Sequence, residues 1–412
     1  MKIAQVAPLY ESVPPTMYGG TERVVSYLTE ELARRGHDVT LYASGDSKTG
    51  ARLVPCSPQG LRLDPSVKDP LAYHVAMMQQ VAHDAFDYDL IHFHTDYLHF
   101  PLSRHYGTAH VTTLHGRLDM PELVPLYRRF RDVPLVSISH AQRRPLPWAN
   151  WKATVYHGLP TDCASLQATP GDYLLFLGRL SPEKRPDRAI EIARLTGLPL
   201  KIMGKVDAAD RAYYRSTIRP LLKSAEVEFV GEGGDGDKFP LLAGALALLF
   251  PIDWPEPFGL VQIEAMAVGT PVIAFPNGSV SEVIDHEITG FIVHSVEEAA
   301  RVVHRAAGLD RGLIRETFEE RFSVERMVDE YEDLYEVLLA DRRHEMKVYT
   351  ADKVRPIRIA KESSAFGSYP AFRDDAVTSR VPHTHIAQIK SLARSPGNES
   401  NTGATRVQMP RV

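Results

Sequence analysis

Cysteines, long apolar runs and net charge are all scarce in this sequence. Only two cysteines, Cys56 and Cys163, occur among 412 residues, and no C-x-x-C spacing is present. This excludes a disulfide framework and a cysteine-based metal site, so we expect a reducing, cytoplasmic setting. The longest apolar run covers residues 241–252. It is shorter than the roughly 20 residues that cross a bilayer, and we expect no transmembrane segment.

The formal net charge is only −5, which gives no reason to expect a nucleic-acid partner. The charge is unevenly placed, however. Residues 343–412 hold 12 lysines and arginines against 6 acidic residues, a net of +6, and they lack hydrophobic periodicity. We expect a disordered tail here. It could contact an acidic partner or a membrane surface, but a solvated tail is the interpretation we prefer.

The sequence does contain a series of alternating strand and helix patterns, and the series occurs twice. In residues 1–160, a helix is expected over 21–35 and short apolar runs predict strands at 3–7, 39–43, 90–94, 110–114, 135–139 and 153–157. These runs lack the in–out alternation of a half-exposed strand, which is typical of parallel strands covered on both faces. Residues 158–170 resemble a linker.

The same pattern restarts in residues 171–322. Strands are predicted at 173–177, 200–203, 227–230, 246–250, 272–275 and 291–293. A helix is expected over 183–195, with Ser181 as its N-cap and Pro182 at its first position. A last helix is expected within 323–342. The fold class is therefore α/β, with two Rossmann-like parallel-sheet domains that face each other across a cleft.

Two glutamates eight positions apart give the strongest chemical signal, in the segment from Glu256 to Glu264. Pro257 disfavours a helical Glu256 and can itself begin a helix. The carboxylates would then be separated by about 12 Å along the helix axis, which is too far to share a proton. They suit two hydroxyl-bearing groups of one extended ligand. The alternative is a helix-dipole partner plus a surface carboxylate.

Two glycine-containing segments suggest phosphate binding. Gly178-Arg179-Leu-Ser-Pro-Glu-Lys184 follows a predicted strand and opens a helix, so it offers amide groups, a helix dipole and two cations to a diphosphate. The alternative is a capped helix with solvated Arg179 and Lys184. Gly19 and Gly20 follow the first strand and would let the backbone approach a phosphate. Considered without the other motifs, this pair is explained as well by a flexible loop.

Histidines occur at the ends of several strand-like runs. His92 and His94 share one strand face, so a metal pair is conceivable, but a hydrogen-bonded structural pair is favoured because no third ligand is evident. His115 sits where a strand should open into the cleft. A structural role is the simpler reading, and a contact with a sugar becomes preferable only through the resemblance described next. The D-x-D triplets at 87–89 and 235–237 are taken as chance matches.

In their order along the chain, these residues resemble the retaining glycosyltransferases of family 4, also called group 1, which have the GT-B fold. The resemblance runs from Met1 to about Leu339. It implies that Glu264 binds the ribose of a nucleotide, Glu256 binds hexose hydroxyls and His115 binds the sugar near its reacting carbon. It also implies that the last helix crosses back onto the first domain. The remaining residues expected at the donor site are Arg179 and Lys184 on the leaving diphosphate, Gly19 and Gly20 near its phosphates, and Phe258, Gly259 and Leu260 along the donor. Residues 278, 279 and 282 match a segment that often borders the donor.

The implied reaction transfers a hexosyl group from a nucleotide-diphosphate sugar to an acceptor hydroxyl, with retention at the anomeric carbon. No metal and no cofactor besides the donor substrate are expected. UDP-glucose and GDP-mannose types of donor both fit, and the acceptor could be a carbohydrate, a lipid or a small molecule. Two alternatives stay open at this stage, a sugar-nucleotide epimerase on the same scaffold and a non-catalytic nucleotide-sugar-binding protein.

Overall fold

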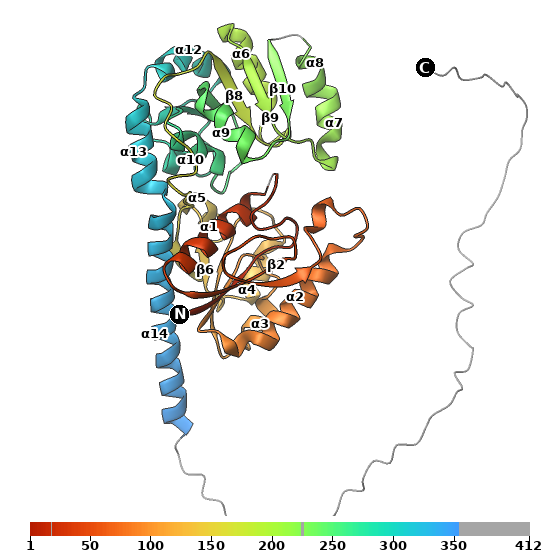
Figure 1. Ribbon diagram of the computed structural model, residues 1–412, viewed down its shortest axis with the longest axis vertical. Helices are drawn as coiled ribbons and strands as arrows, with labels where there is room; N and C mark the ends of the chain where they lie inside the picture. Colours follow the sequence, from red (N-terminus) through yellow and green to blue (C-terminus); the bar gives the residue numbers. More distant parts are fainter. Residues whose placement is uncertain (18, 224–225, 354–412) are drawn as a thin grey trace, which may run out of the picture. The chain divides into compact units, whose positions relative to one another are not determined.

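The computed structural model describes residues 1–17, 19–223 and 226–353, and it contains two parallel β-sheets (Figure 1). The first sheet has the strand order β3-β2-β1-β4-β5-β6-β7. Its strands are β1 (Lys2–Val6), β2 (Asp38–Ser44), β3 (Arg52–Ser57), β4 (Leu90–Phe93), β5 (Ala109–Thr113), β6 (Leu135–Ser137) and β7 (Trp151–Thr154).

The second sheet repeats this arrangement with the order β10-β9-β8-β11-β12-β13. Its strands are β8 (Tyr173–Leu177), β9 (Leu200–Met203), β10 (Val227–Gly231), β11 (Ala245–Phe250), β12 (Val272–Ala274) and β13 (Gly290–Ile292). Every strand pair in both sheets is parallel. The predicted fold class, two Rossmann-like α/β domains of the GT-B type, is therefore confirmed.

Helices connect the strands and cover both faces of each sheet. They are α1 (Gly20–Arg34), α2 (Pro70–Asp84), α3 (Phe100–Ser103), α4 (Leu123–Arg129), α5 (His140–Arg143), α6 (Pro186–Thr196), α7 (Arg211–Tyr213), α8 (Arg219–Leu221), α9 (Asp235–Ala243), α10 (Leu260–Ala267), α11 (Val280–Val283), α12 (Val296–Ala307), α13 (Arg311–Phe322) and α14 (Val324–Lys353). Short 3-10 turns lie at Leu61–Leu63, Ala85–Asp87 and Ala208–Asp210, and a π-helical segment at Tyr214–Ile218. No helix in the described ranges combines the length and the apolarity that a membrane span requires.

Both sheets reverse their winding direction at equivalent places. In the first sheet, β1 lies between β2 and β4; in the second, β8 lies between β9 and β11. Ligands of open parallel sheets bind at this switch point, beyond the carboxyl ends of the strands. The loops after β1, β4, β8 and β11 are therefore the parts of the chain that the fold places at a binding site.

Helix α14 belongs to the second half of the chain but packs on the first domain. Tyr331, Leu334 and Tyr335 share one buried apolar cluster with Ile3 of β1 and Leu28 of α1. Figure 1 shows α14 following α13 and running beside the first domain. The helix extends to Lys353, past residue 342 where we expected it to end. The remainder of the predicted disordered tail lies outside the described residues.

Two predicted helix starts are wrong. Helix α6 begins at Pro186 with Arg185 as its N-cap, and the Ser181 hydroxyl is buried without a hydrogen-bond partner among the described residues. Arg185 adopts a left-handed conformation with φ 52°, which is consistent with the exclusion of α-helical geometry before a proline. Helix α10 begins at Leu260, after Gly259 at φ 81°, so Glu256 lies in the preceding loop rather than at the first helical turn.

Candidate active site

A cavity of about 380 Å³ lies between the two domains at their switch points. This volume is in the range of small-molecule sites. Nine of the residues that we predicted for the donor site line it: Gly19, Gly20, His115, Lys184, Glu256, Phe258, Gly259, Leu260 and Glu264. Residues far apart in the sequence, on two separate sheets, thus meet at one place.

Of the ten residues predicted as catalytic or donor-binding, Arg179 is the one that does not line this cavity. Its guanidinium contacts Glu183 at 2.9 Å and lies 3.7 Å and 3.9 Å from carboxylate oxygens of Asp207 and Asp210. Three carboxylates therefore surround the guanidinium that we expected to bind a diphosphate. The expectation that Arg179 faces the donor needs this correction.

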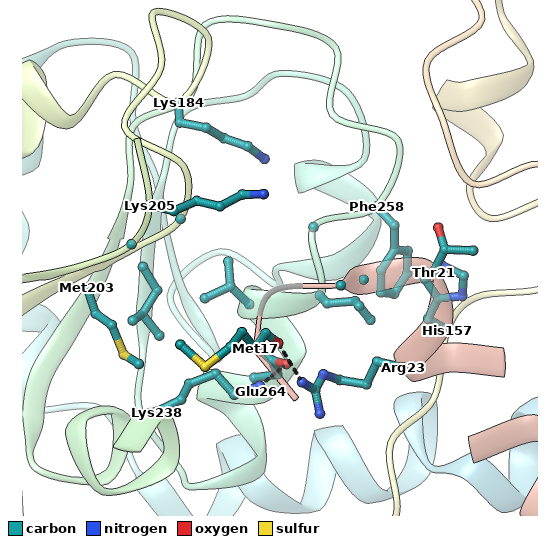
Figure 2. A pocket seen from close by; sticks show the side chains of 18 of the residues that line it. Met17, Thr21, Arg23, His157, Lys184, Met203, Lys205, Lys238, Phe258 and Glu264 are labelled. Carbon is teal, nitrogen blue, oxygen red and sulfur yellow. Dashed lines mark hydrogen bonds and ion pairs between the residues drawn. The ribbon is translucent and has the colours of Figure 1, made fainter. Parts of the chain in front are cut away.

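Lys184 and Lys205 are the cations at the second domain's strand ends. Lys184 follows β8 and Lys205 follows β9, which are neighbouring strands. Figure 2 shows their ammonium groups extending in the same direction from this edge of the sheet. Lys205 also contacts Asp207 at 3.1 Å. Lys205 was not predicted from the sequence, although its position just after a predicted strand was a usable signal.

The loop that carries Glu256 is tightly fixed. The Glu256 carboxylate contacts the Lys184 ammonium and accepts a hydrogen bond of 2.9 Å from Trp254 Nε1. The Ser279 amide donates to the Glu256 carbonyl at 3.0 Å, and the Ser279 hydroxyl donates to the Phe258 carbonyl at 2.7 Å. Gly278 lies so close to the Glu256 backbone that any Cβ at this position would overlap it. Gly278 and Ser279 therefore support the site from behind, without lining the cavity.

Alternating charges connect α10 with the first domain. Glu264 contacts Lys238 at 2.6 Å, and Lys238 contacts Asp235 at 2.7 Å. Asp235 also pairs with Arg23 of α1, across the cavity. Arg23 and Lys238 were not predicted because only the tertiary fold brings them to Glu264. Asp235, from one of the D-x-D triplets, is a member of this ion-pair chain.

Histidines form the wall of the cavity on the first domain. His115 contacts His94 at 2.9 Å between ring nitrogens and stacks on His157 with 5.3 Å between ring centroids. Burial lowers the pKa of His115 to about 3 and lowers that of His157 well below its usual value, because a charged imidazole would lose its hydration. Both rings are neutral at pH 7. His92 and His94 are each hydrogen-bonded to neighbours, which confirms the structural pair.

Glu282 does not border the cavity, contrary to the resemblance. Its carboxylate accepts hydrogen bonds of 2.7 Å from the amides of both His140 and Ala141, at the start of α5, and one of 3.0 Å from the Tyr156 hydroxyl. These contacts join the second domain to the first. Its function in this structure is therefore to hold the domains together.

The described residues contain no group of three or more histidines, cysteines, aspartates or glutamates placed to hold a metal ion. The positive charges in the wall of the cavity come from Lys184, Lys205, Arg23 and Lys238. Amide groups at the start of α1 add to them, because the first turn of a helix has unpaired N–H donors.

Comparisons with known proteins agree with this geometry. Residues 18–157 match the family described as Glycosyltransferase Family 4, and residues 164–309 match Glycosyl transferases group 1. O-antigen chain mannosyltransferase C of Escherichia coli is 24% identical over 391 residues, which cover 82% of this chain and 100% of the relative.

Two solved structures share the fold. A glycosyltransferase involved in avilamycin A biosynthesis superposes with a TM-score of 0.66 and 24% identity, covering 82% of this chain and 98% of that one. HepE of Anabaena, in complex with UDP and glucose, gives a TM-score of 0.62 and 20% identity over 81% and 98% of the two chains. From these matches to both domains and from the shared fold, we conclude that this chain is a glycosyltransferase and belongs to the group 1 glycosyltransferases.

Proposed function

We propose that this enzyme transfers a hexosyl group from a nucleotide-diphosphate sugar to an acceptor hydroxyl with retention of anomeric configuration. The observation that carries the proposal is the composition of the cavity. One space contains paired lysines at adjacent strand ends, the start of a 15-residue helix, two spaced glutamates and neutral histidines. A nucleotide-diphosphate sugar has matching groups: a diphosphate for the lysines and the helix start, and ring hydroxyls for the glutamates and histidines.

Lys184, Lys205 and the start of α1 would bind the diphosphate. Negative charge builds on the leaving phosphate as the glycosidic bond breaks, and fixed cations stabilise it most in the transition state. Glycine is needed at position 19 because a Cβ there would lie 2.7 Å from Pro15 Cβ, whereas a Cβ on Gly20 would make only an ordinary contact, 3.6 Å from Leu260 of the other domain. These cations and amides supply the charge, so we propose that no metal and no further cofactor is required.

The two glutamates would recognise the rings on either side of the diphosphate. Glu264 lies in α10 and would accept hydrogen bonds from the ribose hydroxyls. Glu256 lies in the loop before α10 and would accept them from the hexose. Both residues are largely buried, Glu264 at 5% and Glu256 at 8% of the whole-residue surface. An ionised carboxylate also forms stronger hydrogen bonds than a neutral acceptor.

Two routes lead to retention, a double displacement through an enzyme carboxylate and a front-face reaction, and the way the acidic groups of the cavity are held favours the second. Every carboxylate among the described lining residues has a cationic partner: Glu232 with Arg62, Asp235 with Arg23 and Lys238, Glu256 with Lys184, and Glu264 with Lys238. None is placed as an unpaired nucleophile for a double displacement. A front-face reaction needs no such group, because the departing phosphate oxygen can accept the proton of the acceptor.

The donor is proposed to be a UDP- or GDP-linked hexose, since the similar proteins include a mannosyltransferase and a protein solved with UDP and glucose. A thermal-shift series with UDP-glucose, UDP-galactose, GDP-mannose and the free nucleotides tests this first. NMR of the transfer product then gives the anomeric configuration. An inverted product would refute retention, an epimerised donor without transfer would favour the epimerase, and binding without turnover would favour a non-catalytic binding protein.

A further inference from the structure

A buried series of hydrogen bonds runs from the cavity wall to helix α14. His115 Nε2 contacts His94 Nδ1 at 2.9 Å, and His94 Nε2 contacts Gln5 Oε1 at 2.8 Å. Gln5 Nε2 donates to the Tyr335 hydroxyl of α14 at 3.3 Å. Gln5 and Tyr335 are fully buried, and His94 is 2% exposed. Buried polar groups arranged in this way have one consistent set of donors and acceptors.

The amide of Gln5 determines where the protons lie. Its Oε1 atom can only accept, so His94 Nε2 must carry a hydrogen. Burial lowers the pKa of His94 well below its usual value, so its ring is neutral and its Nδ1 is an acceptor. His115 Nε2 must then donate to that atom. Because the His115 ring is neutral as well, its Nδ1 carries a lone pair.

The far end of the series is consistent with this direction. The Tyr335 hydroxyl accepts from Gln5, which leaves its own hydrogen available for His92 Nδ1 at 2.7 Å. With that arrangement, a neutral His92 carries its hydrogen on Nε2, which lies 2.7 Å from the Thr113 hydroxyl. That hydroxyl lies 2.9 Å from the Tyr331 hydroxyl, also on α14. Helix α14 therefore anchors the series at two tyrosines.

The near end points to a ligand. His115 lines the cavity, and its Nδ1 is a buried atom with no hydrogen-bond partner among the described residues. An unsatisfied buried acceptor is unfavourable because the atom loses its hydration without gaining a hydrogen bond. The atom is shielded from bulk solvent, so a partner must come from a group that the cavity encloses. An acceptor nitrogen selects a hydroxyl and rejects a phosphate or carbonyl oxygen.

We propose that Gln5 and His94 are positioning residues that hold His115 in its Nε2-protonated form, so that Nδ1 accepts a hydrogen bond from one hydroxyl of the transferred sugar. The sugar contact rests on the function proposed above, whereas the proton assignment depends only on the protein. Tyr335 extends the same control to helix α14. The sugar's recognition is thereby coupled to the helix that packs across the first domain.

The proton assignment is tested by NMR of the full-length protein with 15N-labelled histidine and no nucleotide sugar, with His115→Gln used to assign the signals. Nε2-protonated His115 in the unsubstituted protein supports the proposal, and the Nδ1-protonated form overturns it. In Gln5→Met, which removes the acceptor but keeps the side-chain volume, we expect a mixture of the two forms. An unchanged His115 spectrum in this variant would show that Gln5 does not set the tautomer.

The sugar contact is tested with the same variant and with monodeoxy analogues of the donor that the thermal-shift series identifies. Loss of one hydrogen bond should lower kcat/KM about tenfold in Gln5→Met, with unchanged affinity for the nucleoside diphosphate. One deoxy analogue should be impaired with the natural protein and no further impaired with the variant. An equal loss for nucleoside diphosphate and nucleotide sugar would indicate a merely structural role and refute the contact. Thr29→Val, a substitution at another buried position, is the control and should leave kcat/KM unchanged. A loss of kcat/KM in Thr29→Val as large as that in Gln5→Met would also refute the sugar contact. If no nucleotide sugar binds but the Nε2 form is present, the proposed function fails and the proton assignment stands.

Discussion

The Lys184 ammonium and the Glu256 carboxylate form an ion pair in the wall of the central cavity. Their side chains are only 13% and 10% exposed, and 72 positions separate them in the sequence. Lys184 follows β8 and Glu256 follows β11, which are the two strands that flank the switch point of the second sheet. The pair therefore joins the proposed diphosphate position to the proposed hexose position.

Replacing Lys184 tests the leaving-group role. We expect Lys184→Ala to lower kcat about 100- to 1,000-fold, as does the removal of a single group that stabilises transition-state charge in other enzymes. The fold should persist, and thermal unfolding monitored by circular dichroism checks this. Lys201→Ala is a suitable control, because Lys201 forms a more exposed ion pair with Glu228 in the same domain. Undiminished turnover in Lys184→Ala would remove the proposed role.

Glu264→Gln tests recognition of the nucleotide. The variant keeps the shape of the side chain but removes its charge, and a hydrogen bond to a charged group contributes about 1.5–3 kcal/mol. We expect the Kd for the nucleoside diphosphate, measured by calorimetry, to rise about 10- to 100-fold. The free nucleobase should bind equally weakly to both proteins. A nucleoside diphosphate that binds the variant at full affinity would place the ribose elsewhere.

The sequence predicts most of the fold because strands buried on both faces leave uninterrupted apolar runs. Strand β3 was missed because it is an edge strand, with several partly or fully exposed residues and a proline at position 55. Helix starts were less predictable. A serine followed by proline suggested a cap at Ser181, but Pro186, five residues after this serine, begins the helix instead.

The site was predictable where its residues adjoin strands and recognisable motifs. Lys184, Glu256 and His115 were found in this way. His157 ends the strand predicted at 153–157 and was missed because it belongs to no motif. Arg23 and Lys238 also belong to no motif, and they come together at the cavity only through the pairing of the two domains. Arg179 belongs to a motif but does not line the cavity. Its guanidinium instead lies near three carboxylates from residues 183, 207 and 210, and the sequence gives no sign of these contacts.

Deleting the residues after Lys353 should spare donor binding. The residues that line the cavity all lie between Met17 and Glu264, and a deletion after Lys353 keeps the whole of α14. We expect the Kd for the nucleoside diphosphate to stay within about twofold of the full-length value, because every lining residue is retained. Loss of binding in a truncated protein with normal circular dichroism would show that the deleted segment contributes to the site.

Glu22 should make stability depend on pH. Burial raises its pKa from 4.5 to about 7. The folded protein therefore keeps a proton that the unfolded chain releases above about pH 4.5, so stability falls as pH rises through this window. By about pH 8 the loss reaches roughly 3 kcal/mol. Glu22→Gln should remove that loss, which urea unfolding at pH 5 and pH 8 would measure. Glu336→Gln, at an exposed position on α14, is the control. An equal effect of Glu22→Gln at both pH values would contradict the shifted pKa.

Alanine substitutions at Gly278 and Gly36 separate two effects, displacement of the Glu256 backbone and conformational strain at a glycine with positive φ. Both glycines have positive φ angles, 62° and 89°, so alanine at either position adds about 1–2 kcal/mol of conformational strain. Only at Gly278 would the new Cβ also overlap the backbone of Glu256, whereas Gly36 has nothing within 4 Å of that position. We therefore expect Gly278→Ala to lower kcat about 100-fold by displacing Glu256, and Gly36→Ala to lower only the unfolding temperature. Full turnover in a folded Gly278→Ala protein would mean that hexose transfer tolerates a displaced Glu256, and the proposed contact between its carboxylate and the sugar would have to be abandoned.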